Sequence, residues 1–135
     1  EITTRLVGSE MCIRDRYKPF LDEIGLTYTQ YITMMAVREH EELSVKELGE
    51  LLFLDSGTLT PVLKTLEKKG LLSRKRSSED ERILIVTLTE SGTKLKEQAV
   101  EVPFKMQGCM LIDEKDAAEL CRILHTVMEN ISLDK

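Results

Sequence analysis

Near its midpoint, this 135-residue chain changes from helical to strand-like spacing of its apolar residues. Residues 27–70 place leucine, valine and methionine three or four positions apart, as amphipathic helices do. Ile83-Leu84-Ile85-Val86-Thr87-Leu88 is instead a short, β-branched run, and helical spacing resumes from Thr89 onward. Three helices, a hairpin and further helices in this order predict a mainly α fold built as a winged helix-turn-helix.

Two pairs of polar residues mark where helices of this region begin. Thr27 and Gln30, and again Ser44 and Glu47, stand three positions apart. A hydroxyl and an amide or carboxylate at this spacing each accept from the other residue's backbone N–H, an arrangement called a capping box. We therefore expect one helix to open at Thr27 and end near Glu41, and a second to open at Ser44.

A proline and a glycine bound the next helix. Pro61 lacks an N–H and is tolerated only near the first turn, so the helix should begin between Asp55 and Thr58. Gly70 after two lysines is a typical stop. The spacing places Leu59, Val62, Leu63 and Leu66 inward and Lys64, Lys68 and Lys69 outward.

Short runs at 71–75 and 83–88 flank the polar segment 76–82, which predicts a two-stranded β wing. We then expect a long helix from Thr89, kinked at Pro103. The inward positions of this helix are Leu95, Ala99, Val102 and Met106.

The last helix is capped by Asp113, and both it and the long helix before it carry apolar stripes too wide for so small a body to cover, which favours a homodimer. The stripe of the last helix consists of Ala117, Leu120, Cys121, Leu124, Met128 and Ile131. We expect one domain over 1–135, with 27–88 as its winged-helix part and 1–26 and 89–135 as its dimerisation part.

The net charge of −5 argues against indiscriminate coating of nucleic acid, but residues 55–88 carry seven basic and five acidic side chains. This local excess fits either a phosphate-binding surface or a solvated charged face. The basic residues are Lys64, Lys68, Lys69, Arg74, Lys75, Arg76 and Arg82.

Three scattered cysteines without a CxxC motif predict neither a disulfide scaffold nor a metal site, and we expect no cofactor. Each cysteine is then either a small buried hydrophobe or a redox-active thiol. No apolar run approaches the ~18 residues that span a bilayer, and no secretory signal is visible, so we expect a cytoplasmic protein without membrane contact.

Two runs carry a resemblance to the MarR family of transcriptional regulators. Leu54-Asp55-Ser56-Gly57-Thr58-Leu59-Thr60-Pro61 resembles its recognition-helix start, and Asp80-Glu81-Arg82 followed by Leu88-Thr89 resembles its wing signature. Tyr17-Lys18-Pro19 and the segment 26–31 are similar to the organic-hydroperoxide-sensing, OhrR-like branch. The resemblance covers residues 17–131 and implies a homodimeric repressor of a pseudo-palindromic DNA operator, without enzymatic activity.

The resemblance also assigns DNA contacts. Ser56, Gly57, Thr58, Thr60 and Lys64 match the helix that enters the major groove, although a plain helix cap would need the same residue types. Arg82 matches the arginine that enters the minor groove, with Asp80 as its orienting partner; a surface ion pair between them is the alternative. Arg74 and Arg76 complete the expected basic surface.

Sensors of this branch hold a reactive cysteine beside two tyrosines, which match Tyr17 and Tyr28. That cysteine should lie about four helical turns before Tyr17, near Thr3, where none is present. Cys12 has the wrong spacing, and residues 6–16 have poor helical periodicity and resemble a translated sequencing-adapter fragment. With this origin, Cys12 is not part of the natural sequence, and the fragment has replaced the segment that held the sensor cysteine.

Two cysteines remain. Cys109 falls close to the resolving cysteine of the two-cysteine subgroup, which condenses with an oxidised partner thiol. Cys121 is expected to pack in the core.

The sequence leaves one alternative effector and two alternative protein classes to compare with a repressor that senses organic hydroperoxide. The first is a MarR-type repressor that responds to a small phenolic ligand held between the dimerising and DNA-binding parts. A thiol peroxidase would need neither a basic wing nor a recognition helix. A winged-helix module that binds only protein would not need the capped Ser56-Gly57-Thr58 start or Arg82.

Overall fold

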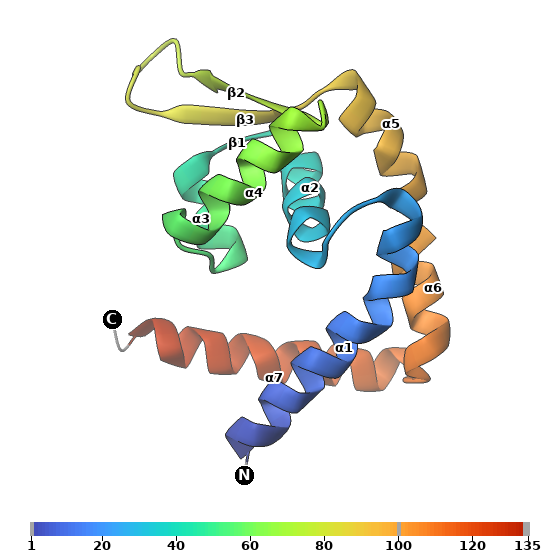
Figure 1. Ribbon diagram of the computed structural model, residues 1–135. Coiled ribbons are helices and arrows are strands. Elements are labelled where there is room, and N and C mark those ends of the chain that lie inside the picture. The colour runs from blue at the N-terminus through green and yellow to red at the C-terminus, as the bar shows by residue number, and fades with distance from the viewer. Residues whose placement is uncertain (1, 100, 134–135) are drawn as a thin grey trace.

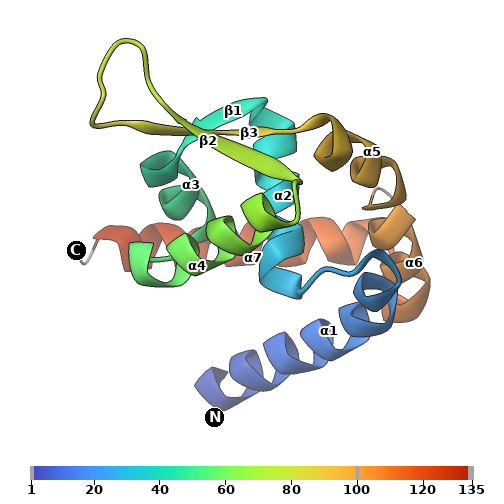
Figure 2. The same ribbon diagram turned by 45° about the horizontal axis from the view of Figure 1, so that its top comes forward.

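The computed structural model describes residues 2–99 and 101–133 and confirms the predicted mainly α, winged-helix order (Figure 1). Helices α2 to α4 and a small sheet form one part, α1 extends away from it, and α7 runs from α6 back below it in Figure 1 and behind it in Figure 2. The elements are α1 (Ile2–Ile24), α2 (Tyr28–His40), β1 (Glu42–Ser44), α3 (Val45–Leu52), α4 (Ser56–Lys68), β2 (Leu72–Arg76), β3 (Leu84–Leu88), α5 (Glu90–Ala99), α6 (Glu101–Met110) and α7 (Glu114–Leu133).

The predicted capping boxes form in both places. The Thr27 hydroxyl accepts from the Gln30 backbone N–H at 3.3 Å, and the Gln30 side chain accepts from the Thr27 N–H at 3.2 Å. Ser44 and Glu47 exchange the same two bonds at 3.1 and 2.9 Å. Helices α2 and α3 therefore begin where the local sequence indicates.

The sheet has three strands, in the order β1-β3-β2, rather than the two that were predicted. Strand β1 pairs antiparallel with β3, with Leu43 opposite Val86. The sequence pattern hides this strand because it is three residues long and its last residue, Ser44, is also the N-cap of α3. The extra strand fixes the base of the wing to the end of α2.

The core joins the winged-helix part to the start of the dimerisation part. Val37 of α2, Leu48 of α3, Leu63 of α4 and Val86 of β3 are all inaccessible to solvent. The predicted inward residues Leu59, Leu63 and Leu66 of α4 are buried, and so are Ala99, Val102 and Met106 farther along the chain.

The helix predicted from Thr89 is described as α5 and α6, on either side of Val100, which lies outside the described residues. Pro103 is the third residue of α6, and the kink expected there stays a prediction. Asp113 caps α7 as predicted, accepting from the Asp116 N–H at 2.8 Å.

Helix α7 is almost entirely exposed to solvent in the single chain. Every residue of α7 whose burial is described is exposed, apart from the half-buried Ala117. Cys121 is exposed as well, so the prediction that it packs in this protomer's core is wrong. The reason is that the whole apolar stripe, which includes Leu124 at 40% exposure, lies outside the core of the single chain.

Residues 6–16 form part of the continuous helix α1 despite their poor apolar periodicity. Positions 8–16 are all exposed, so this stretch needs no apolar face to pack. None of the described helices combines the length and apolar character needed to cross a membrane.

Candidate nucleic-acid interface

The start of α4 is an exposed, capped helix end. Asp55 accepts from the Thr58 backbone N–H at 2.7 Å, and this bond holds the pKa of the Asp55 carboxyl below its ordinary value. Ser56, Gly57 and Thr58 are exposed, and Thr60 is half-buried. The Asp55 carboxylate therefore caps this end, and the short side chains beside it let another molecule approach the helix backbone closely.

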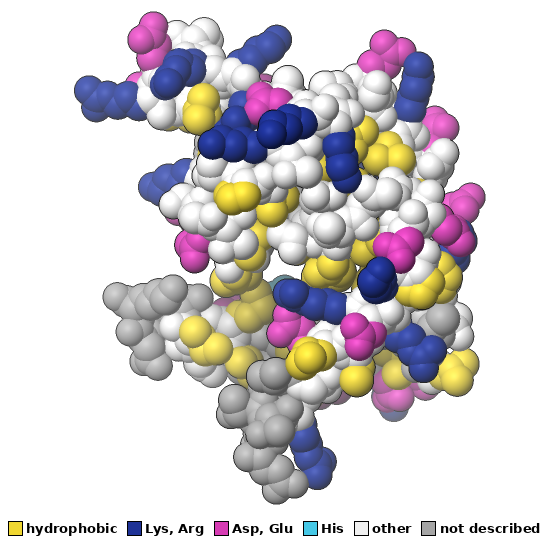
Figure 3. All heavy atoms as spheres, in the orientation of Figure 1, with side chains coloured by type: hydrophobic (Ala, Val, Ile, Leu, Met, Phe, Trp, Pro, Cys, Tyr) yellow, Lys and Arg dark blue, Asp and Glu magenta, His cyan; other side chains and the backbone are white. Residues whose placement is uncertain are grey.

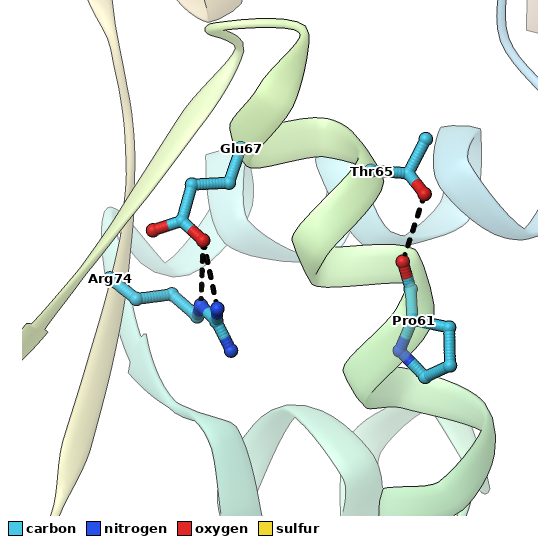
Figure 4. Close-up of polar contacts among 4 residues, drawn as sticks. All are labelled: Pro61, Thr65, Glu67 and Arg74. Carbon is cyan, nitrogen blue, oxygen red and sulfur yellow. Dashed lines mark hydrogen bonds and ion pairs between the residues drawn. The ribbon is translucent and has the colours of Figure 1, made fainter.

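Farther along α4, one face packs while the other stays in solvent. Lys64 and Lys68 are exposed on the side opposite the buried leucines, as predicted. The Thr65 hydroxyl donates to the Pro61 carbonyl at 3.0 Å, so it bonds within the helix (Figure 4).

Lys69 is exposed, as its spacing predicts, but its ammonium group also bonds to another part of the chain. Its ammonium group donates to the Gly25 carbonyl at 2.7 Å and to Oε1 of Gln30 at 3.2 Å. It thus ties the end of α4 to the turn between α1 and α2, and its charge is engaged there.

The wing is an antiparallel hairpin of β2 and β3, in which Arg76 pairs with Leu84. At its tip, Asp80 accepts from the backbone N–H of Arg82 at 3.0 Å, and no ion pair joins the two described side chains. Asp80 therefore shapes the turn rather than the Arg82 guanidinium, which is exposed. Arg76 donates to the Glu81 carbonyl at 2.6 Å across the loop.

Arg74 lies deeper than the other arginines of the wing. Its Nε and Nη2 donate to the same carboxylate oxygen of Glu67, on α4, at 3.1 and 2.8 Å (Figure 4). The side chains of Arg74 and Glu67 are 19% and 38% exposed.

Lys and Arg side chains gather over the wing and the adjoining part of α4 (Figure 3). The wing loop and the start of α4 lie on the same side of the molecule, away from α5 and α6 (Figure 1). The sequence-predicted contact residues belong to these two elements: Ser56, Gly57, Thr58, Thr60 and Lys64 to α4, and Arg76, Asp80 and Arg82 to the wing.

A second cluster forms where α1 meets α2. The rings of Tyr17 and Tyr28 are 5.3 Å apart in an edge-on arrangement, and Tyr31 adds a third ring 5.8 Å from Tyr17. Burial, then the neighbouring tyrosines, raises the pKa of Tyr31 to about 12; burial and then Tyr28 also raise the pKa of Tyr17. Tyr31 was missed as a site residue, although its position three residues after Tyr28 places both on one helix face.

The cysteines do not join this cluster. Cys12 is exposed, and its five-residue offset from Tyr17 turns it about 140° around α1. Cys109 belongs to α6, but its side chain lies outside the described part of the structure, as does that of Thr3. No group of acidic, histidine or cysteine side chains that could hold a metal ion occurs among the described residues.

Comparison with known proteins matches residues 15–99 to the family described as "Transcriptional regulator SarA/Rot". The chain is 45% identical over 126 residues to the organic hydroperoxide resistance transcriptional regulator of Bacillus subtilis (strain 168), covering 93% of this chain and 86% of that protein. It is 46% identical over 114 residues to the HTH-type transcriptional regulator SarZ of Staphylococcus aureus (strain USA300), covering 84% and 76%.

A solved structure with the same architecture is that of reduced AbfR bound to DNA. It superposes with a TM-score of 0.83 at 27% identity, covering 97% of this chain and 90% of that chain.

Proposed function

Because this chain belongs to the SarA/Rot family of MarR-type transcriptional regulators, we propose that it is a homodimeric DNA-binding repressor of the organic-hydroperoxide-sensing type. The observation that carries the proposal is the shared surface of the capped α4 start and the basic wing. Similarity to AbfR, whose structure is bound to DNA, supports the same use of this surface.

In this proposal α4 enters the major groove. The hydroxyls of Ser56, Thr58 and Thr60 meet phosphates and base edges, while Gly57 permits close approach and Lys64 neutralises a phosphate. The exposed Arg82 reaches into the adjacent minor groove, where the narrow, negative channel favours a guanidinium. Asp80 holds the turn that presents Arg82, and Arg76 closes the loop.

The exposed apolar stripe of α7 supports the dimer. Leu120, Leu124 and Ile131 are 49%, 40% and 60% exposed in the single chain, which is unfavourable unless a second copy covers them. A two-fold dimer of winged helices binds two half-sites whose centres are about one helical turn, ~10 bp, apart. The expected operator is therefore pseudo-palindromic.

A gel-shift series tests DNA binding. The dimer should bind an AT-rich pseudo-palindrome with an affinity that falls steeply as salt rises, because each neutralised phosphate releases counterions. A flat salt dependence would refute the proposal.

The sensing step uses the tyrosine cluster. Position 3 lies about 21 Å along α1 from Tyr17, at 1.5 Å per residue, so a thiol there cannot touch Tyr17 of its own protomer. We infer that the native thiol meets Tyr17 and Tyr28 of the second copy. Its thiolate attacks the hydroperoxide, giving a sulfenic acid and an alcohol, and condensation with the Cys109 thiol then gives a disulfide and water.

The present chain should therefore bind DNA but respond poorly to organic hydroperoxide, because Cys12 lies off the tyrosine face. A chain whose sequence upstream of Tyr17 is restored, with a cysteine near position 3, should regain oxidant-driven release of DNA. Mass spectrometry should then find a disulfide to Cys109. If the present chain and its Cys12→Ser variant both respond fully to organic hydroperoxide, this sensor assignment is contradicted. The DNA-binding proposal would be unaffected.

A small phenolic ligand is the second candidate effector. A cavity of about 280 Å³ opens between α1 and α2, and Lys18, Leu21 and Tyr28 are among its lining residues. Asp15 and Asp22 also line this cavity, and Lys18 donates to Asp22 at 3.0 Å, so the apolar and aromatic walls suit an uncharged phenol rather than a carboxylate. Release of DNA by a small phenol under reducing conditions would favour this effector over hydroperoxide.

A further inference from the structure

The direction of Arg74 follows from the alternation of side chains along β2. Leu72 is 1% exposed and Arg74 lies two residues later, so both point to the same face of the strand, toward the body of the domain. Lys75 points the other way and is exposed. Arg74 is therefore aimed at α4 and not outward along the wing.

Two hydrogen bonds to one carboxylate oxygen of Glu67 hold the Arg74 guanidinium against α4. Nη2 and Nε of Arg74 reach Oε2 of Glu67 at 2.8 and 3.1 Å, and only 19% of the Arg74 side chain is exposed (Figure 4). Charge-assisted bonds of this kind are among the stronger polar contacts in proteins. The pair is also neutral, so it adds no net positive charge to the basic surface.

Moving Arg74 to a phosphate would be unfavourable. The move would leave the partly buried Glu67 carboxylate unpaired beside a second negative group. The contact also gives β2 a second attachment to α4, in addition to the short turn in which the Leu71 N–H donates to the Leu66 carbonyl at 3.0 Å. The ion pair adds to the placement that pairing with β3 and burial of Leu72 already give the strand.

We propose that Glu67 and Arg74 are positioning residues for DNA recognition: their ion pair sets the wing relative to α4, and Arg74 does not itself contact DNA. This inference rests on the proposed function. The sequence assigns Arg74 to the DNA-binding surface, whereas in this inference its contact lies within the protein. The acidic residue Glu67 then supports DNA binding although it does not touch DNA.

The direction in which Glu67→Gln changes DNA affinity separates a positioning role of the ion pair from a direct contact of Arg74 with phosphate. Removing an acidic charge beside DNA ordinarily strengthens binding, because repulsion of phosphate is lost. Glu67→Gln should instead weaken DNA binding, by about 2- to 30-fold, because the wing loses its anchor. Arg74→Met should weaken binding to a similar extent while leaving the salt dependence of log Kd unchanged, since no phosphate contact is lost.

The experiment measures Kd by fluorescence anisotropy over a salt series, with hydroxyl-radical footprinting and a melting curve for each variant. Glu79→Gln, on the exposed wing loop, is the matched control for charge and should strengthen binding slightly. Lys68→Met, exposed on α4, is the matched control for Arg74→Met. Hydroxyl-radical footprints of Glu67→Gln should lose the minor-groove protection at the wing, while protection of guanine N7 from dimethyl sulfate in the major groove at α4 should stay.

Stronger binding by Glu67→Gln would overturn the inference, because it shows that Glu67 only repels phosphate. A salt slope lowered by about one in Arg74→Met would overturn it as well, because it shows Arg74 on a phosphate. Loss of all protection at temperatures where the variant is folded would also overturn it. Absence of DNA binding by the unaltered chain would instead refute the proposed function, so the two failures are distinguishable.

Discussion

The dimer can be tested by shortening two leucines of α7. Leu120 and Leu124 are 49% and 40% exposed in the single chain, so covering both removes from water about the area of one whole leucine side chain. That burial contributes ~1.5–3 kcal/mol per protomer. A two-fold interface contains each contact twice, so the double substitution Leu120→Ala/Leu124→Ala should cost ~3–6 kcal/mol per dimer. The dimer dissociation constant should rise about 10²- to 10⁴-fold.

Sedimentation velocity over a dilution series measures this constant directly. Because both leucines lie outside the protomer core, far-ultraviolet circular dichroism of the double variant should stay helical while the dimer dissociates. Glu129→Ala, on the same helix but away from the stripe, is the control and should leave the constant unchanged. A double variant that dimerises as tightly as the unaltered chain would refute the reasoning that α7 forms the interface.

Three further predictions concern single side chains. Arg82→Ala should cost ~1–3 kcal/mol of DNA affinity with no change in Tm, because this side chain is exposed and has no packing to lose; a lowered Tm would give it a structural role instead. The raised pKa values of Tyr17 and Tyr31 mean that the folded state favours the neutral phenols. Their contribution to the free energy of unfolding is therefore full below about pH 10 and is lost as the pH rises toward 12. Urea titrations at each pH should show a smaller loss in Tyr31→Phe. Lys69→Met should lower the free energy of unfolding by about 1 kcal/mol through loss of its two bonds, whereas Lys68→Met should leave it nearly unchanged in the same titrations.

Helix starts were predictable because their signals are local. Each capping box is set by two residues three positions apart, and the Asp55 cap follows from the position of Pro61. The start of α4 and the exposed wing tip could therefore be located before any tertiary contact was known.

Contacts between distant segments were not predictable. Strand β1 exists because its backbone pairs with β3, about 40 residues later, and no side-chain pattern records that pairing. The ion pair of Arg74 depends on which face of β2 meets α4, and the bonds of Lys69 depend on where the α1–α2 turn lies. Sequence spacing alone assigned both residues to the solvent or the DNA.

The central claim is that α4 and the wing together bind DNA, and the salt dependence of binding tests it most directly. The measurement is log Kd against log salt, from about 50 to 200 mM, for a duplex that the protein selects from a random pool. We predict a steep slope for the unaltered dimer, lowered by about one in Lys64→Met and again by about one in Arg82→Ala. A shallow slope that neither substitution changes would contradict the account.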